Sequence, residues 1–166
     1  MSAETRRDVV VEYPIDDEQE SLERTHRIVN NILNKLNRTP CYFLFQSADN
    51  IPQACLASCD LALLDVDFGT RTNGIDLARA LRNVNSRAVL IFITNFVEYA
   101  PEGYEVQAFR YILKRDLDTV LGRHLIEALE LVSDYQDSLR VEHRGELLEL
   151  PFDGILYLEV LGHSVS

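Results

Sequence analysis

The sequence predicts an α/β fold with an open, mostly parallel sheet and helices on both of its faces. Short β-branched or apolar runs alternate along the chain with segments in which apolar residues recur at helical spacing. The runs at 61–66 and 89–93 have almost no polar alternation. A strand of that kind is covered on both faces, as strands of parallel sheets are.

Five strand and helix pairs follow one another in this pattern. The predicted strands are 9–11, 42–45, 61–66, 89–93 and 111–113. The predicted helices are 22–36, 50–57, 75–81, a broken helical stretch at 99–108, and 117–132. Pro40 ends the first helix, and a turn-rich loop at 69–74 precedes the third. We therefore expect one full domain over residues 1–134.

The pattern changes after about residue 137. Two strand-like runs, 139–143 and 147–150, flank Arg144-Gly145-Glu146 and predict a hairpin. A third run, 155–159, follows the Asp153-Gly154 turn and is expected to extend the hairpin into a meander. Roughly thirty residues of meander bury too little surface to fold alone. We interpret residues 135–166 as a linker and the first strands of a truncated β domain, with a short packed appendage as the alternative.

Composition narrows the class of protein. The net charge of −11 repels phosphate backbones, so the chain is a poor nucleic-acid binder by itself. The three cysteines, Cys41, Cys55 and Cys59, have no zinc-like spacing and indicate reduced core thiols. No apolar run approaches the ~18 residues of a membrane span. We expect a cytoplasmic protein without a membrane partner.

Polar residues stand where the predicted strands end. They are Asp16 and Asp17 after the first strand, Asp65 in the third, Thr94 after the fourth and Lys114 after the fifth. In parallel α/β sheets these ends meet at one edge, where ligands bind. Three carboxylates there would repel one another, and a hard cation such as Mg²⁺ would offset the repulsion. The sequence therefore predicts a magnesium-dependent site centred on Asp65.

The same segments resemble the receiver domains of bacterial response regulators. The resemblance covers about residues 9–132 and rests on five motifs in order: Ile15-Asp16-Asp17-Glu18, Leu64-Asp65-Val66-Asp67, Asn73-Gly74-Ile75-Asp76-Leu77, Ile93-Thr94 and Tyr111-Ile112-Leu113-Lys114. It implies a flavodoxin-like (βα)5 fold with sheet order 2-1-3-4-5. The tail, Ile155-Leu156-Tyr157-Leu158-Glu159 with Gly162-His163, is similar to the start of a LytTR-type DNA-binding domain.

The resemblance also implies roles for individual residues. Asp65 would accept a phosphoryl group from a sensor histidine kinase, and Asp16, Asp17, Asp65 and the backbone carbonyl of Asp67 would bind Mg²⁺. Lys114 would pair with the phosphate, which the hydroxyl of Thr94 would also reach. Tyr111 would turn inward into the space that Thr94 leaves, so that the phosphate charge becomes a change in packing. The activity would be switching and self-directed phosphotransfer, not turnover of a separate substrate.

Partners follow from the same resemblance. The mixed charges of residues 99–132 suit a weak two-fold homodimer. DNA would be contacted only through the largely missing LytTR-type domain, with His163 as a candidate contact.

Simpler interpretations remain for several of these residues. Asp65 is also consistent with a loop acid, Asp16 and Asp17 with a helix cap, and Lys114 with a solvated lysine. Thr94 and Tyr111 are also consistent with ordinary strand residues. The alternatives for the whole chain are a degenerate receiver that acts only in dimerisation and a Mg²⁺-dependent aspartyl phosphotransfer enzyme.

The sequence departs from the receiver pattern at three places. Pro14 lies at the end of the expected first strand, where a missing N–H breaks the hydrogen-bonded ladder. This proline predicts a bulge or an insertion before Asp16. Arg115 stands where receivers commonly have a proline, and the usual proline of the loop after Asp65 is absent. If the first strand instead ends at Glu12-Tyr13, the second acidic position is a tyrosine and metal binding is expected to weaken. Neither of the other two departures removes a reacting group.

Overall fold

The structure is a computed structural model that describes residues 17–38, 40–45, 51–66, 73–137, 140–143, 146–149 and 155–160. Its helices are α1 (Asp17–Lys35), α2 (Gln53–Ala57), α3 (Gly74–Val84), α4 (Ala100–Glu105) and α5 (Leu117–Asp137). Its strands are β1 (Pro40–Phe45), β2 (Leu61–Leu64), β3 (Val89–Thr94), β4 (Arg110–Leu113), β5 (Arg140–His143), β6 (Glu146–Glu149) and β7 (Ile155–Val160). Two 3₁₀ turns, η2 (Val97–Tyr99) and η3 (Lys114–Asp116), precede α4 and α5.

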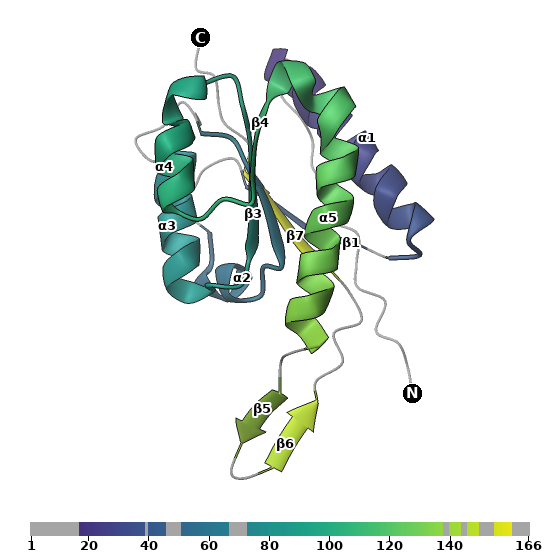
Figure 1. The fold of residues 1–166 in the computed structure, drawn as a ribbon, viewed down its shortest axis with the longest axis vertical. Helices are drawn as coiled ribbons and strands as arrows, with labels where there is room; N and C mark the ends of the chain where they lie inside the picture. The colour runs from purple at the N-terminus through teal and green to yellow at the C-terminus, as the bar shows by residue number, and fades with distance from the viewer. Residues whose placement is uncertain are drawn as a thin grey trace.

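Five strands form one parallel sheet in the order β1-β7-β2-β3-β4 (Figure 1). The sheet confirms the predicted α/β class with parallel strands. It also confirms the predicted strands at 42–45, 89–93 and 111–113, and the one predicted at 61–66 as far as Leu64.

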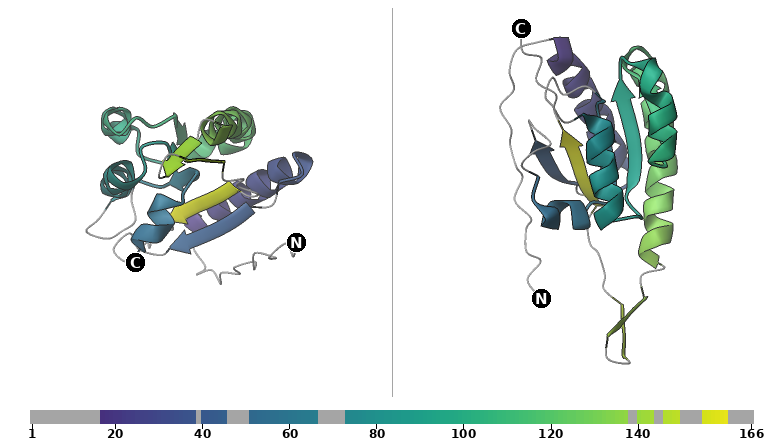
Figure 2. Two further views of the ribbon diagram at one scale, coloured as in Figure 1. Left: turned by 90° about the horizontal axis from the view of Figure 1, so that it is seen from below. Right: turned by 90° about the vertical axis from the view of Figure 1, so that its left-hand side faces the viewer.

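The strands β2 and β3 are buried on both faces because helices cover both sides of the sheet (Figures 1 and 2). Ala62 and Leu64 point to one side, where they pack with α2 and α3. Leu61 and Leu63 point to the other side, where they pack with α1 and α5. This two-sided burial is the physical reason for the unbroken apolar runs in the sequence.

The long helices bury the stripes that their periodicity predicts. On α5 the buried residues are Leu117, Leu121, Leu125, Ala128, Leu129 and Val132. Ile126 does not belong to this buried stripe and is 41% exposed. The helical period explains this, because residue 126 lies about 100° round the helix from Leu125.

The inner position of the sheet between β1 and β2 is taken by a strand that was not predicted there. The segment 155–159 was predicted to form a meander with 147–150, and that prediction is wrong. β7 lies in parallel between β1 and β2, with Leu158 opposite both Phe43 and Ala62. Its apolar sequence suits a strand that is covered on both faces. The predicted first strand, 9–11, and Pro14 lie outside the described residues.

The rest of the C-terminal region agrees with the sequence. β5 and β6 form the predicted antiparallel hairpin, which is a separate two-stranded sheet beyond the end of α5 (Figure 1). The boundary that we place near residue 135 stays a prediction. Among the described helices, none has the length and apolar character needed to cross a membrane.

Candidate functional site

The predicted site lies at the carboxyl edge of three neighbouring strands. β2 ends at Leu64, immediately before Asp65, and β3 ends at Thr94. β4 pairs Leu113 with Thr94 and is followed by Lys114. The topology therefore brings Asp65, Thr94 and Lys114 to one edge, where open α/β sheets bind ligands.

Asp65 and Lys114 form an ion pair at this edge. Lys114 Nζ lies 2.6 Å from Asp65 Oδ2, and the two side chains are only 13% and 12% exposed. Charged groups with so little contact with water need a partner of opposite charge. The pair joins β2 to β4 across β3, and it excludes the interpretation of Lys114 as a solvated lysine.

The backbone that carries Asp65 is fixed by the start of α3. Gly74 N–H donates to the carbonyl of Val66 at 2.8 Å. A Cβ atom at Gly74 would lie 1.9 Å from the carbonyl oxygen of Asp65, so only glycine fits this contact. Asn73 and Asp76 form a capping box that fixes the same turn.

Thr94 and Tyr111 are joined through the backbone of Phe96. Thr94 is fully buried, and its Oγ1 accepts a hydrogen bond from Phe96 N–H at 3.3 Å. The hydroxyl of Tyr111 donates to the carbonyl of the same Phe96. The two predicted switch residues therefore both hydrogen-bond to Phe96 in the β3–η2 loop, Thr94 to its N–H and Tyr111 to its carbonyl.

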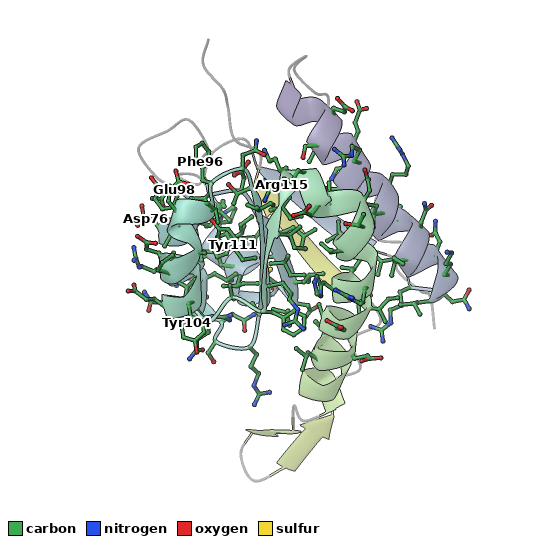
Figure 3. All side chains as sticks on the ribbon, turned by 45° about the horizontal axis from the view of Figure 1, so that its top comes forward. Asp76, Phe96, Glu98, Tyr104, Tyr111 and Arg115 are labelled. Carbon is green, nitrogen blue, oxygen red and sulfur yellow. The ribbon has the colours of Figure 1, made fainter. Side chains whose placement is uncertain are left out.

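Tyr111 lies half-buried on the side of the sheet that faces α4 (Figure 3). Burial raises the pKa of its phenol to about 12, and the carboxylates of Glu98, Asp65 and Glu102 act in the same direction. The phenol therefore stays protonated at neutral pH and can donate to Phe96.

The predicted metal ligands are only partly placed. The side chain of Asp65 is described, whereas Asp16, Asp67 and His163 lie outside the described residues. Asp17 begins α1, and its side chain is not described. Within the described part of the chain, no group of three or more His, Cys, Asp or Glu residues is arranged to hold a metal ion.

Two contributors to the site were not predicted. Phe96 acts through its backbone N–H and carbonyl, which no sequence motif reveals. Gly103 of α4 lies against the ring of Tyr111. The one available sign was a glycine inside a short helical stretch, where glycine is unfavourable unless close packing requires it.

Comparisons with known proteins agree with this architecture. The response regulatory domain of the protein MrkE from Klebsiella pneumoniae superposes with a TM-score of 0.51 at 20% identity, covering 72% of this chain and 95% of that domain. A CheY-like receiver domain protein from Methanospirillum hungatei JF-1 is also similar, with a TM-score of 0.45 at 19% identity over 74% of this chain and 92% of that protein. The fold is therefore similar to that of the MrkE response regulatory domain, which agrees with the predicted flavodoxin-like α/β architecture.

A sequence relative adds a more particular likeness. The chain is 28% identical over 87 residues to the sensory transduction protein LytT of Bacillus subtilis (strain 168). The matched region is 52% of this chain and 36% of LytT, so the chain spans only about a third of that relative. No protein-family model matches the chain.

Proposed function

We propose that the chain is the receiver part of a response regulator and that Asp65 accepts a phosphoryl group from a sensor histidine kinase. The ion pair of Asp65 and Lys114 is the observation that carries this proposal, because it sets an attacking carboxylate beside a fixed cation. In phosphoryl transfer, catalysis is mostly positioning and charge stabilisation. A carboxylate oxygen of Asp65 attacks phosphorus, the bond to the donor breaks, and Lys114 pairs with the new phosphate.

The donor chemistry of the sequence fits magnesium. The candidate ligands, Asp16, Asp17, Asp65 and the carbonyl of Asp67, are all oxygen donors, which Mg²⁺ prefers. When bound, the ion would spread the negative charge of the transferring group. The ion pair with Lys114 already removes part of the repulsion that three clustered carboxylates would otherwise create.

Phosphorylation would be read out through Thr94 and Tyr111. If Thr94 turns its hydroxyl to a phosphate oxygen, the Phe96 N–H loses its present acceptor. The carbonyl of Phe96, which accepts from Tyr111, belongs to the same residue. A charge event at Asp65 would therefore move the loop and the position of Tyr111 together.

The output would lie beyond the receiver. LytT is described as a sensory transduction protein, and the tail of this chain is similar to the start of a LytTR-type DNA-binding domain. We propose that the receiver controls such a domain in a longer protein and that DNA is contacted only there, with His163 as a candidate contact. A weak homodimer through residues 99–132 would couple phosphorylation of the receiver to DNA binding by the second domain.

The activity would be a self-directed phosphotransfer, so the protein is a switch and not an enzyme with a separate substrate. An aspartyl phosphotransfer enzyme would also need a pocket for its substrate. A degenerate receiver would have no use for a lysine held against the acceptor carboxylate, as Lys114 is held here.

The test is labelling with acetyl phosphate and Mg²⁺. We expect the parent chain to form an adduct that is stable in acid and labile to base and hydroxylamine, as an acyl phosphate is. Asp65→Asn should lose the label, and so should the parent in EDTA. Glu130→Gln makes the same change of carboxylate to amide at an exposed position of α5 and should keep it. Equal labelling of the parent and Asp65→Asn would overturn the assignment.

A further inference from the structure

Gly103 lies where a side chain would compete with Tyr111 for space. This glycine is buried in α4. A Cβ atom there would lie 3.1 Å from Cδ2 and 3.3 Å from Cε2 of Tyr111, and 3.5 Å from Cδ2 of Phe92. The first two distances are tighter than ordinary van der Waals contact, so a methyl group at position 103 would press on the ring of Tyr111.

The ring of Tyr111 has little freedom to avoid that pressure without losing contacts. On one side it packs against Phe92, with ring centroids 5.7 Å apart and planes tilted by 44°. At its tip the hydroxyl donates to the carbonyl of Phe96. The ring thus occupies a gap bounded by Phe92, Phe96 and the bare backbone of Gly103. Because Tyr111 is only partly buried, the ring can be displaced toward solvent.

We propose that Gly103 is a positioning residue for the switch, in that its missing side chain sets how far inward Tyr111 lies. The atoms a methyl would meet belong to the Tyr111 side chain and not to backbone, so the ring gives way before the helix does. The consequence for signalling rests on the proposed function. The effect on Tyr111 itself is independent of phosphorylation and can be measured in the unmodified chain.

Gly122 of α5 offers a matched control. A Cβ atom there would meet only the methyl groups Cγ2 of Ile28 and Cδ1 of Ile32, both at 4.0 Å. In an unobstructed helix, alanine is more favourable than glycine. Gly122→Ala should therefore raise the melting temperature. Gly103→Ala should raise it less or lower it, because the displaced ring loses its contacts with Phe92 and Phe96.

The experiment measures the exposure of Tyr111 by nitration with tetranitromethane. Trypsin separates Tyr111, in the peptide 111–114, from Tyr104, in the peptide 88–110. The longer peptide also contains Tyr99, so tandem mass spectrometry assigns each nitrated tyrosine. Tyr104 is 86% exposed and serves as an accessible reference. In the parent, Tyr111 should react far more slowly than Tyr104, since its hydroxyl is bonded and burial raises its pKa to about 12.

We expect Gly103→Ala to increase the initial nitration rate of Tyr111 several-fold and Gly122→Ala to leave it unchanged. In a Tyr111→Ala background, Gly103→Ala should become as stabilising as Gly122→Ala. An unchanged Tyr111 rate in Gly103→Ala would overturn the proposal, whether stability rises or falls. Acetyl phosphate labelling of Asp65, run in parallel on each chain, tests the proposed function separately. Its absence in every chain would contradict the proposed function and leave the nitration result intact.

Discussion

Asp65 and Lys114 hold opposite charges in a place where each side chain is only 13% exposed or less. In such surroundings, removing one charge leaves the other unpaired, which costs more than the pair itself contributes. Asp65 and Lys114 therefore depend on each other for stability. Under the proposed function, Lys114 gains a more strongly charged partner when Asp65 is phosphorylated.

Gly74 sets the backbone of Asp65 and gives a prediction at the scale of one residue. A Cβ atom there would lie 1.9 Å from the carbonyl oxygen of Asp65, which is backbone and cannot rotate away. We expect Gly74→Ala to lower the free energy of unfolding by about 3 kcal/mol, measured by urea denaturation. Labelling by acetyl phosphate should also slow, because the acceptor moves with its backbone.

Gly122→Ala is again the control, and glycine-to-alanine changes at open helical sites stabilise by up to about 1 kcal/mol. If Gly74→Ala matched Gly122→Ala in both stability and labelling, the contact between α3 and Asp65 would contribute to neither property.

The positions of the candidate site residues were predictable from the sequence, and the hydrogen bonds that connect them were not. Asp65, Thr94 and Lys114 follow from rules about where parallel strands end, and the structure brings them to one edge. The links through Phe96 use backbone atoms, which every residue has. Their geometry depends on how the β3–η2 loop folds, and periodicity contains no information about that.

At the scale of elements, the central strand shows where pattern reasoning fails. An apolar run predicts a strand, but it does not say between which neighbours the strand lies. The chain has two runs suited to the central position, 9–11 and 155–160, and chain order favours the first. In the structure β7 lies between β1 and β2. A long connection through the β5–β6 hairpin therefore leads back to an inner position of the sheet.

Proline substitution tests which strand is central. In β7, Leu158 is paired with neighbours on both sides, so Leu158→Pro removes an inner hydrogen bond of the sheet. We expect a loss of about 3 kcal/mol or more in the free energy of unfolding. Leu148→Pro, in the two-stranded β5–β6 hairpin, should leave the main unfolding transition nearly unchanged. Thermal denaturation followed by circular dichroism measures both.

Val10→Pro completes the comparison, because residue 10 belongs to the competing N-terminal run. Should Val10→Pro remove the cooperative transition while Leu158→Pro spares it, the N-terminal run and not β7 would form the central strand in solution.

For the whole molecule, the net charge of −11 opposes self-association at long range. A homodimer therefore needs local complementarity at its interface. Residues 99–132 carry charges of both signs, which two copies of the chain could place opposite one another. Arg110 pairs with Glu127 at 2.9 Å, and both side chains stay more than a third exposed. His124 Nδ1 lies 3.0 Å from the same Glu127 oxygen, and the guanidinium of Arg110 stacks on the ring of Phe109. These contacts hold Arg110 and Glu127 in fixed positions at the surface.

Sedimentation velocity with and without beryllofluoride and Mg²⁺ tests the dimer and its dependence on Asp65. We expect weak association in the unmodified chain and tighter association with beryllofluoride, because only a ligand that favours one of two states shifts a population. Arg123→Glu reverses an exposed charge within 99–132 and should weaken the dimer on the order of tenfold, since a two-fold interface contains each contact twice. Arg87→Glu makes the same change outside this region, also at an exposed position, and should not weaken it.

A monomer under all conditions would contradict the proposed dimer. Equal affinity with and without beryllofluoride would keep the interface but separate it from Asp65, and equal weakening by both variants would trace the effect to net charge.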